Sequence, residues 1–221
     1  MKAAAPEPEP FVRVTEIFRS LQGESTRAGF PCAFVRLTGC SLRCVWCDSA
    51  YAFHGGAELP VSEAARRVAA LETDLVEVTG GEPLEQEGVY PLMENLLGRG
   101  KTVMLETGGH LPLGRVDPRV VKIVDVKAPG SGMQSANLPE NLEALGPRDE
   151  LKFVLADRAD FDWSLDLVRR RDLDRRHVVT FSPVWETLAA RDLADWIRDS
   201  GRNVRLGLQL HKLLWGDVPG R

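Results

Sequence analysis

The sequence predicts an α/β protein that folds as an open, partial (β/α)6-type barrel with reduced helices and an extra N-terminal strand. Short apolar runs recur along the chain, amphipathic segments lie between them, and the most distinctive motifs follow directly after the runs. The length of 221 residues suits a single domain, which we place at residues 11–221. Residues 1–10 contain three prolines and two glutamates but no apolar core, so we expect a disordered leader rather than a signal peptide.

Each predicted strand is largely apolar for four to six residues and is bounded by glycine, proline or charge, as in a buried parallel sheet. The predicted strands cover residues 33–37, 75–79, 102–106, 121–126, 151–155, 177–181 and 204–208. Residues 11–18 alternate imperfectly between apolar and polar side chains, which predicts one more strand ahead of the repeating unit.

Four amphipathic segments between these strands are predicted to form helices, at residues 62–72, 89–97, 161–171 and 185–200. The segment 89–97 is followed by Gly98 and Gly100, which favour a helix end, and the segment 185–200 follows Ser182-Pro183, which favours a helix start. Residues 108–119 are too short and too rich in glycine and proline for a helix, so we expect one crossover without one.

Composition and charge narrow the class of protein. Hydrophobic residues make up 43% and charged residues 27% of the chain, which is typical of a globular protein, and no apolar run reaches the ~20 residues that cross a bilayer. The net charge is -4 with both signs interleaved, and the arginine-rich segment 169–176 is best explained as a solvated helix end with neutralising aspartates. We therefore expect a cytoplasmic protein with reduced thiols that acts on a small molecule, without nucleic-acid or membrane partners.

Three cysteines, Cys40, Cys44 and Cys47, follow the first predicted barrel strand in a Cys-x3-Cys-x2-Cys array, so one loop can wrap three thiolates around a metal centre. A structural zinc site or a ferredoxin-like electron carrier would need a fourth ligand, for which Cys32 is the candidate. Cys32 begins the same strand, roughly 20 Å of chain away by strand rise, so we expect it in the core. Three ligands leave one iron of a four-iron cluster open for chemistry.

A second motif, Gly80-Gly81-Glu82-Pro83, follows the next predicted strand. Paired glycines let backbone groups approach a ligand, and the Glu82 carboxylate can accept a hydrogen bond from an amino group. Trp46, between the last two cysteines, suits stacking on an adenine and equally suits a place in the core. A Gly-Gly turn is a weak signal alone, but one βα unit after a three-cysteine loop it indicates a cofactor site.

Two later strand ends carry further polar groups. Glu106 and Thr107 end one predicted strand, and Asp125, Lys127 and Ser131 share a tight loop after another. Each group could contact a cofactor, and each is equally well explained as a capped strand end with a surface ion pair.

The cysteine loop, with Trp46 before its last cysteine and Gly80-Gly81-Glu82 one unit later, resembles the radical S-adenosylmethionine (radical SAM) superfamily. The resemblance implies that three thiolates hold a [4Fe-4S] cluster whose open iron chelates the methionine amino and carboxylate groups of SAM. Gly80, Gly81 and Glu82 would bind the same amino group. One electron would cleave the sulfonium to a 5′-deoxyadenosyl radical that abstracts a substrate hydrogen, with no catalytic residue beyond that cofactor radical.

The flanking segments are more specific. They are Ser20-Leu21-Gln22-Gly23-Glu24, Gly29-Phe30-Pro31, Phe34-Val35-Arg36-Leu37-Thr38-Gly39-Cys40, Trp46-Cys47-Asp48-Ser49-Ala50-Tyr51 and Gln209-Leu210-His211-Lys212. Together they resemble the 7-carboxy-7-deazaguanine synthase family, and the resemblance covers both ends of the chain. It implies a radical SAM lyase that converts 6-carboxy-5,6,7,8-tetrahydropterin to 7-carboxy-7-deazaguanine with loss of ammonia, in deazapurine (queuosine-type) biosynthesis.

The implied mechanism is hydrogen abstraction from C6 of the pterin, ring contraction assisted by Mg2+, return of hydrogen from 5′-deoxyadenosine and loss of ammonia, with SAM regenerated. The family further implies a homodimer and a flavodoxin- or ferredoxin-type reductant.

The resemblance implies that eight residues bind the substrate: Leu21, Gln22, Glu24, Arg36, Thr79, Gly81, Gln209 and His211. The Glu24 carboxylate can clamp the donor-and-acceptor edge of a pterin, and the Arg36 guanidinium can pair with its carboxylate. Arg36 stands in a buried strand, where a charge needs a partner, and a substrate carboxylate would provide one.

The implied magnesium ligand departs from the family. The residue after Cys-Asp is typically a threonine, whereas this chain has Ser49, which keeps the hydroxyl oxygen that a hard cation needs. We therefore expect the magnesium site to persist. Ser25 and Ser41 also replace a usual glycine and a usual asparagine, and Ser25 bears on the placement of Glu24 because it restricts the loop.

Two alternatives stay open at this point. A radical-activating enzyme that abstracts hydrogen from a partner protein shares the cysteine loop and the Gly-Gly-Glu-Pro turn, but it gives no reason for Gln22, Glu24 or Arg36. A non-enzymatic zinc module would use Cys32 as its fourth ligand.

Overall fold

The computed structural model of the chain describes residues 8–220. Most of the predicted leader over residues 1–10 therefore lies outside the described residues. The part that is described contacts the start of the first helix: the Glu9 carboxylate accepts a hydrogen bond from the Ser62 backbone N–H at 2.7 Å, and the Pro10 carbonyl accepts one from Val61 at 3.0 Å. These contacts satisfy two N–H groups that a helix start leaves without intrahelical partners.

The described residues form a nine-stranded sheet in the order β3-β1-β2-β4-β5-β6-β7-β8-β9. Seven strands run parallel to one another: β2 (Pro31–Leu37), β4 (Leu75–Gly80), β5 (Thr102–Thr107), β6 (Val121–Asp125), β7 (Glu150–Leu155), β8 (Val178–Pro183) and β9 (Val204–Leu206). The predicted extra strand is β1 (Phe11–Leu21), which pairs antiparallel with β2. A short strand that the sequence did not predict, β3 (Ala57–Pro60), pairs antiparallel with β1. The sheet is not closed, so the predicted open barrel is confirmed.

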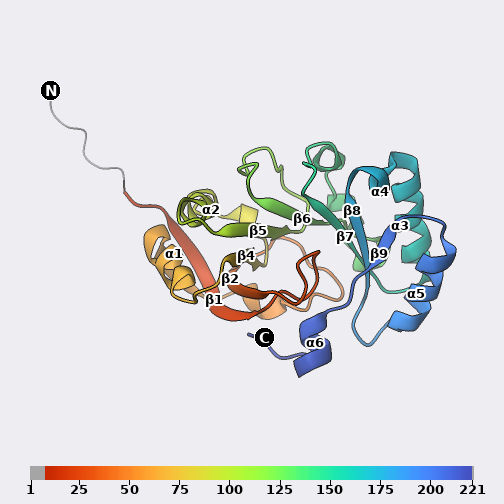
Figure 1. Cartoon of the computed structure of the whole chain (residues 1–221), viewed down its shortest axis with the longest axis horizontal. Helices are drawn as coiled ribbons and strands as arrows, with labels where there is room; N and C mark the ends of the chain where they lie inside the picture. The colour runs from red at the N-terminus through yellow and green to blue at the C-terminus, as the bar shows by residue number, and fades with distance from the viewer. Residues whose placement is uncertain (1–7, 221) are drawn as a thin grey trace.

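Six α-helices accompany this sheet in the described chain: α1 (Val61–Ala69), α2 (Val89–Gly98), α3 (Arg158–Arg171), α4 (Leu173–Arg176), α5 (Ala190–Asp199) and α6 (Leu210–Trp215). Figure 1 shows α1 and α2 gathered at one end of the sheet and α3, α4 and α5 at the other. None of these helices combines the length and the apolar character that crossing a bilayer requires. The crossover from β5 to β6 has no helix, as predicted, and the one from β6 to β7 contains only short 3-10 turns.

The helix predicted over residues 185–200 begins later than expected, at Ala190. Ser182-Pro183 does not start a helix, because both residues still pair with β7 as the last two positions of β8. Glu186 then adopts a left-handed backbone conformation with φ of 59°, which no helix continues through. The residues before Ala190 therefore form a loop at the carboxyl end of β8.

Apolar side chains pack on both faces of the sheet, as the alternating residues of β2 show. Its alternate residues Val35 and Leu37 join the large apolar cluster under the helices, whereas Cys32 and Phe34 face the other way. On that inner face Phe34 stacks on Phe18, with ring centroids 4.9 Å apart, beside residues at the amino ends of the neighbouring strands. The inner face is thus apolar near the amino ends of the strands, which leaves its other end for polar side chains.

The substitution Phe153→Ala tests the outer core. The Phe153 side chain is fully buried and its ring meets the ring of Phe181 edge-on, with centroids 5.2 Å apart. We expect the free energy of unfolding, measured by urea denaturation, to fall by about 3–5 kcal/mol. Phe11→Ala is the matched control, because Phe11 is 55% exposed, and it should cost less than about 1 kcal/mol. Equal losses for the two variants would contradict this core.

Candidate active site

A cavity of about 570 Å³ opens on the inner face of the sheet at the carboxyl ends of the strands. Its lining includes every predicted site residue except Ser131: Leu21, Gln22, Glu24, Arg36, Cys40, Cys44, Trp46, Cys47, Ser49, Thr79, Gly80, Gly81, Glu82, Glu106, Thr107, Asp125, Lys127, Gln209 and His211. The structure therefore brings residues from both ends of the chain to one site.

The three-cysteine loop forms one wall of this cavity, and all three thiols are partly exposed. The loop is folded tightly, since the Cys47 N–H donates to the Cys44 carbonyl at 3.3 Å. Among residues 8–220, no three Cys, His, Asp or Glu side chains stand close enough together to surround a single metal ion. A four-iron cluster makes a different demand, because each thiolate binds its own iron and the sulfur atoms need not meet at one point.

Cys32 lies outside the cavity. Its side chain is 0% exposed within the inner apolar cluster, and its thiol faces the Ala33 carbonyl at 3.5 Å. Burial raises the pKa of the Cys32 thiol, so it stays uncharged. The alternative in which Cys32 completes a four-ligand zinc site is therefore wrong, and the cavity wall offers three thiols.

The Gly-Gly turn after β4 is pressed against the backbone that leads into the cysteine loop. Gly81 N–H donates to the Leu37 carbonyl at 3.0 Å, and Glu82 N–H donates to the Gly39 carbonyl at 2.7 Å. A Cβ atom on Gly81 would overlap the Gly39 carbonyl oxygen and lie 2.9 Å from the Cys40 Cβ. Only glycine fits here, and the turn and the cluster loop form one cradle that suits a cluster with a ligand bound to it.

Glu82 connects the loops after β4 and β5. Its buried carboxylate accepts hydrogen bonds from the Thr107 hydroxyl at 2.9 and 3.0 Å, from Gly108 N–H at 2.8 Å and from Leu84 N–H at 3.0 Å. Burial raises the pKa of Glu82 against the effect of these donors. Glu82 and Thr107 are therefore engaged with each other, and their predicted contacts to an amino group and to a ribose stay predictions.

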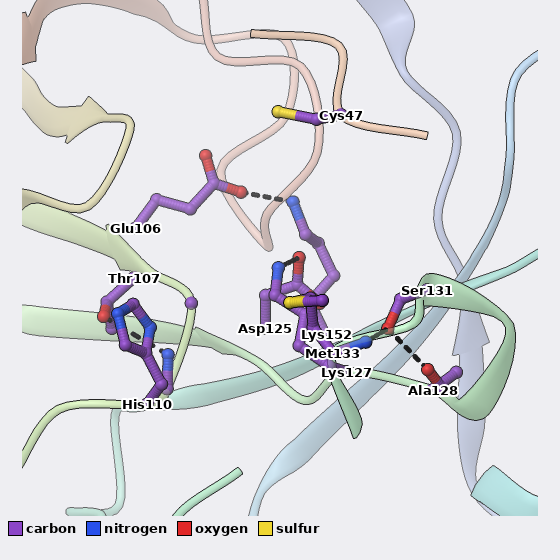
Figure 2. Close-up of polar contacts among 12 residues, drawn as sticks. Cys47, Glu106, Thr107, His110, Asp125, Lys127, Ala128, Ser131, Met133 and Lys152 are labelled. Carbon is purple, nitrogen blue, oxygen red and sulfur yellow. Dashed lines mark hydrogen bonds and ion pairs between the residues drawn. The ribbon is translucent and has the colours of Figure 1, made fainter. Parts of the chain in front are cut away.

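Lys152, in the middle of β7, lies on the polar floor of the cavity and was missed by the sequence interpretation. Its ammonium group lies 2.7 Å from Glu24 Oε2 and also pairs with the Glu106 carboxylate. Figure 2 shows the pair with Glu106. Burial opposes the charge of Lys152, but Glu106, Glu24 and Asp125 raise its pKa well above the usual range. One feature of the sequence could have indicated its role: a lysine stands inside an otherwise apolar predicted strand.

Gln22 shapes the loop that carries Glu24. Its amide donates to the Glu77 carboxylate at 2.9 Å and accepts hydrogen bonds from the backbone N–H groups of Glu24 and Ser25, both at 2.9 Å. Thr26 N–H donates to Glu150 at the start of β7, at 3.1 and 3.2 Å. These bonds tie the loop between β1 and β2 to β4 at one point and to β7 at another. The loop therefore lies across the inner face of the sheet and forms the floor of the cavity.

Arg36 has a partner that the sequence interpretation did not foresee. Its Nε lies 2.7 Å from the Glu16 carboxylate on β1, the residue directly opposite in the strand register, and the Tyr51 hydroxyl donates to the same oxygen at 2.8 Å. The argument that Arg36 needs a substrate to balance its charge is therefore wrong. Arg36 nevertheless lines the cavity.

The C-terminal segment supplies another wall. The Gln209 amide donates to Glu24 Oε1 at 2.9 Å and to Asp48 Oδ2 at 3.0 Å, and the Lys212 ammonium lies 3.3 Å from the same oxygen of Asp48. Burial opposes the charge of Asp48, but Lys212 and Gln209 hold its pKa below the usual value. Ser49, the predicted magnesium ligand, lines the cavity next along the chain, with its hydroxyl 3.8 Å from the Cys47 sulfur.

Three residues were predicted as cofactor contacts at the carboxyl end of β6, and two of them line the cavity. Asp125 and Lys127 line the cavity as an ion pair at 2.8 Å. Ser131 is turned into its own loop, where its hydroxyl donates to the Ala128 carbonyl at 2.6 Å and accepts from Met133 N–H at 3.1 Å, as Figure 2 shows. Ser131 supports the cluster loop instead, because its carbonyl accepts from Val45 N–H at 3.0 Å.

Comparison with known proteins agrees with this site. The model of the Radical SAM superfamily matches residues 34–185, and the chain belongs to that superfamily. Two curated 7-carboxy-7-deazaguanine synthases are similar along nearly their whole length: that of Koribacter versatilis is 47% identical, over 92% of this chain and 97% of the relative, and that of Chlorobaculum tepidum is 44% identical, over 92% and 94%. Within the superfamily, the chain belongs to the 7-carboxy-7-deazaguanine synthase family. The crystal structure of QueE from Escherichia coli has the same fold, with a TM-score of 0.73 at 23% identity over 91% of this chain and 95% of that one.

The substitution Gly81→Ala tests the cradle. The added methyl group would displace the Gly39 carbonyl and the Cys40 loop, so we expect less than half of the wild-type iron to bind on anaerobic reconstitution, measured by iron analysis and visible absorbance. Gly98→Ala is the matched control, because a Cβ there meets nothing within 4 Å at the end of α2. It should keep full iron content, and equal losses in both variants would contradict the cradle.

The cysteines can be separated by substitution. We expect Cys44→Ala to abolish the absorbance of the reconstituted four-iron cluster, because it removes a thiolate from the cavity wall. Cys32→Ala should keep that absorbance and cost only about 1 kcal/mol of stability, since it removes a small buried group. If Cys32→Ala also lost the cluster absorbance, Cys32 would have to be counted as a fourth ligand.

Proposed function

We propose that this chain is a radical SAM lyase that converts 6-carboxy-5,6,7,8-tetrahydropterin to 7-carboxy-7-deazaguanine with loss of ammonia, in deazapurine biosynthesis of the queuosine type. The observation that carries the proposal is that the three-cysteine wall and the Glu24–Lys152–Glu106 floor belong to one cavity. Its volume lies in the range of small-molecule sites. A radical-activating enzyme gives no role to this polar floor, so the small-molecule reaction is the better explanation.

The [4Fe-4S] cluster and SAM, when bound, supply the 5′-deoxyadenosyl radical that starts the reaction. Cys40, Cys44 and Cys47 would hold the cluster, and the backbone of Gly80 and Gly81 would lie against the methionine part of SAM. The glycine cradle supports this placement because the close approach of Gly81 to Gly39 and Cys40 holds the turn against the loop that carries the cluster ligands.

The chain's own residues bind and orient the substrate in this proposal. Glu24, pinned by Lys152 and Gln209, accepts hydrogen bonds from the donor edge of the pterin. The Arg36 guanidinium bonds Glu16 through Nε, and its remaining N–H groups are directed to the substrate carboxylate. Gln22 acts through the loop whose shape it fixes. The C-terminal segment, with His211 against Gly23, keeps water out of the cavity.

We further propose that the Ser49 hydroxyl would hold Mg2+, which would supply positive charge to the substrate carboxylate. A hydroxyl oxygen suits this hard cation, which usually keeps several waters and takes few protein ligands. Asp48 is engaged with Lys212 and Gln209, so its carboxylate serves the wall rather than the metal.

The proposal includes a homodimer, a flavodoxin- or ferredoxin-type electron donor and residence in the cytoplasm. The first two expectations come from the family, and the third comes from the composition of the chain.

Anaerobic turnover tests the proposed function. Reconstituted protein with SAM, reductant and carboxytetrahydropterin should release ammonia and 7-carboxy-7-deazaguanine in equal amounts, many times per SAM added, measured by coupled ammonia assay and mass spectrometry. Omitting Mg2+ should lower the rate, and Ser49→Thr should keep it whereas Ser49→Ala should not. Reductive cleavage of SAM without any product from the pterin would rule the proposal out.

A further inference from the structure

Lys152 joins two carboxylates that come from distant parts of the chain. Glu24 lies on the floor loop between β1 and β2, Glu106 lies on β5, and both bind the ammonium group of Lys152 on β7. The Lys152 side chain is only 11% exposed, and it lines the same cavity as the cysteines. Burying three charged side chains costs desolvation free energy and adds little net stability. The contact is therefore better explained by a role in the site.

The charges around Lys152 show what it contributes. Asp125 has its own partner in Lys127, at 2.8 Å. Glu77 is buried beneath Gln22, whose amide donates to its carboxylate at 2.9 Å, and burial together with the nearby Glu106 raises its pKa well above the usual range. Glu24 and Glu106 are the two carboxylates that contact the ammonium group of Lys152.

Glu24 is held from two sides. Its Oε2 receives a hydrogen bond from Lys152 at 2.7 Å and its Oε1 receives one from the Gln209 amide at 2.9 Å. Each carboxylate oxygen can accept a second hydrogen bond, so both remain available to a ligand in the cavity. An ionised acceptor makes hydrogen bonds roughly twice as strong as a neutral one.

We propose that Lys152 is a positioning residue that makes the site specific for a donor-rich heterocyclic edge, because its ammonium group contacts both Glu24 and Glu106 and orients the two carboxylates in the cavity. The 2-amino-4-oxopyrimidine half of a pterin presents such an edge, with an amino group and a ring N–H side by side. An edge that carries acceptors in those places meets two negative groups and is rejected. The inference rests on the proposed function, since the pterin supplies the edge.

Other charged or titratable groups face Glu24 and Glu106 from the elements around them. They are Arg36 on β2, Asp48 on the cluster loop, Glu77 on β4, Asp125 at the end of β6, Lys127 in the loop after it, and His211 and Lys212 on α6. All of them are common to the wild type and the variants below, so a difference between pH profiles reports the change at the floor itself.

The test compares reconstituted full-length holoenzymes with carboxytetrahydropterin as substrate. In Lys152→Met, the KM should rise about tenfold or more, because a charged hydrogen-bond network is lost. The acid limb of kcat/KM should also move to higher pH, because burial opposes the charge of Glu106 and Lys152 lowers its pKa, so without the ammonium Glu106 protonates sooner as the pH falls. Lys152→Arg keeps the charge and should return the limb to the wild-type position.

Glu106→Gln keeps the lysine but removes the carboxylate whose pKa Lys152 lowers. One anionic acceptor of the proposed edge is then lost, so the KM should rise as it does in Lys152→Met. Should Lys152→Met fail to fold, the KM of Glu106→Gln still decides the question.

Lys122→Met is the matched control, because Lys122 is also buried on the sheet and paired with a carboxylate, Asp149 at 2.9 Å, but lies outside the cavity. It should lose stability while KM and the acid limb stay unchanged. If Glu106→Gln keeps the wild-type KM, or Lys152→Met keeps the wild-type KM and limb, the inference is overturned. A wild-type enzyme that cleaves SAM but releases no ammonia from the pterin removes the proposed function and this inference with it.

Discussion

The site depends on the hydrogen-bonded register between β2 and β4. This register sets Leu37 opposite Gly80, so the cysteine loop and the Gly-Gly turn leave the sheet side by side. The backbone bonds from Gly81 and Glu82 back to that loop then lock the two segments together before any cofactor is considered. Because the next strands run parallel, their loops open at the same edge, where Glu82 binds Thr107 and fixes the third segment.

The inner face of the sheet carries two kinds of surface, and their separation explains how so many charges are accommodated. The amino ends of the strands hold an apolar cluster around Phe34 and Cys32, which makes a dry base. Above it, charged side chains are arranged so that most ions have a partner within hydrogen-bond distance, such as Glu16 with Arg36. Burying paired ions adds little net stability compared with apolar packing. The pairing therefore fits a role in holding groups still for a ligand.

Local patterns in the sequence sufficed for every described strand except β3, for most helices and for the cysteine loop, because each depends on neighbouring residues. The start of α5 was misplaced, since the strand pairing of Ser182-Pro183 outweighs the local preference of proline for a helix start. The partner of Arg36 and the role of Lys152 needed the tertiary structure: Lys152 and Glu24 are 128 positions apart. Ser131 was predicted to contact the cofactor, but its hydroxyl is hydrogen-bonded within its own loop, which the sequence pattern could not show.

The C-terminal segment ties the two halves of the cavity together through Asp48, which follows the cluster ligand Cys47 in the chain. Its last described residues, including Gly220, line the cavity. Protein engineers should therefore treat this end as part of the site, because a purification tag or fusion partner joined there begins at the cavity rim. The other end is safer for such additions, since Glu9 lies against the first turn of α1.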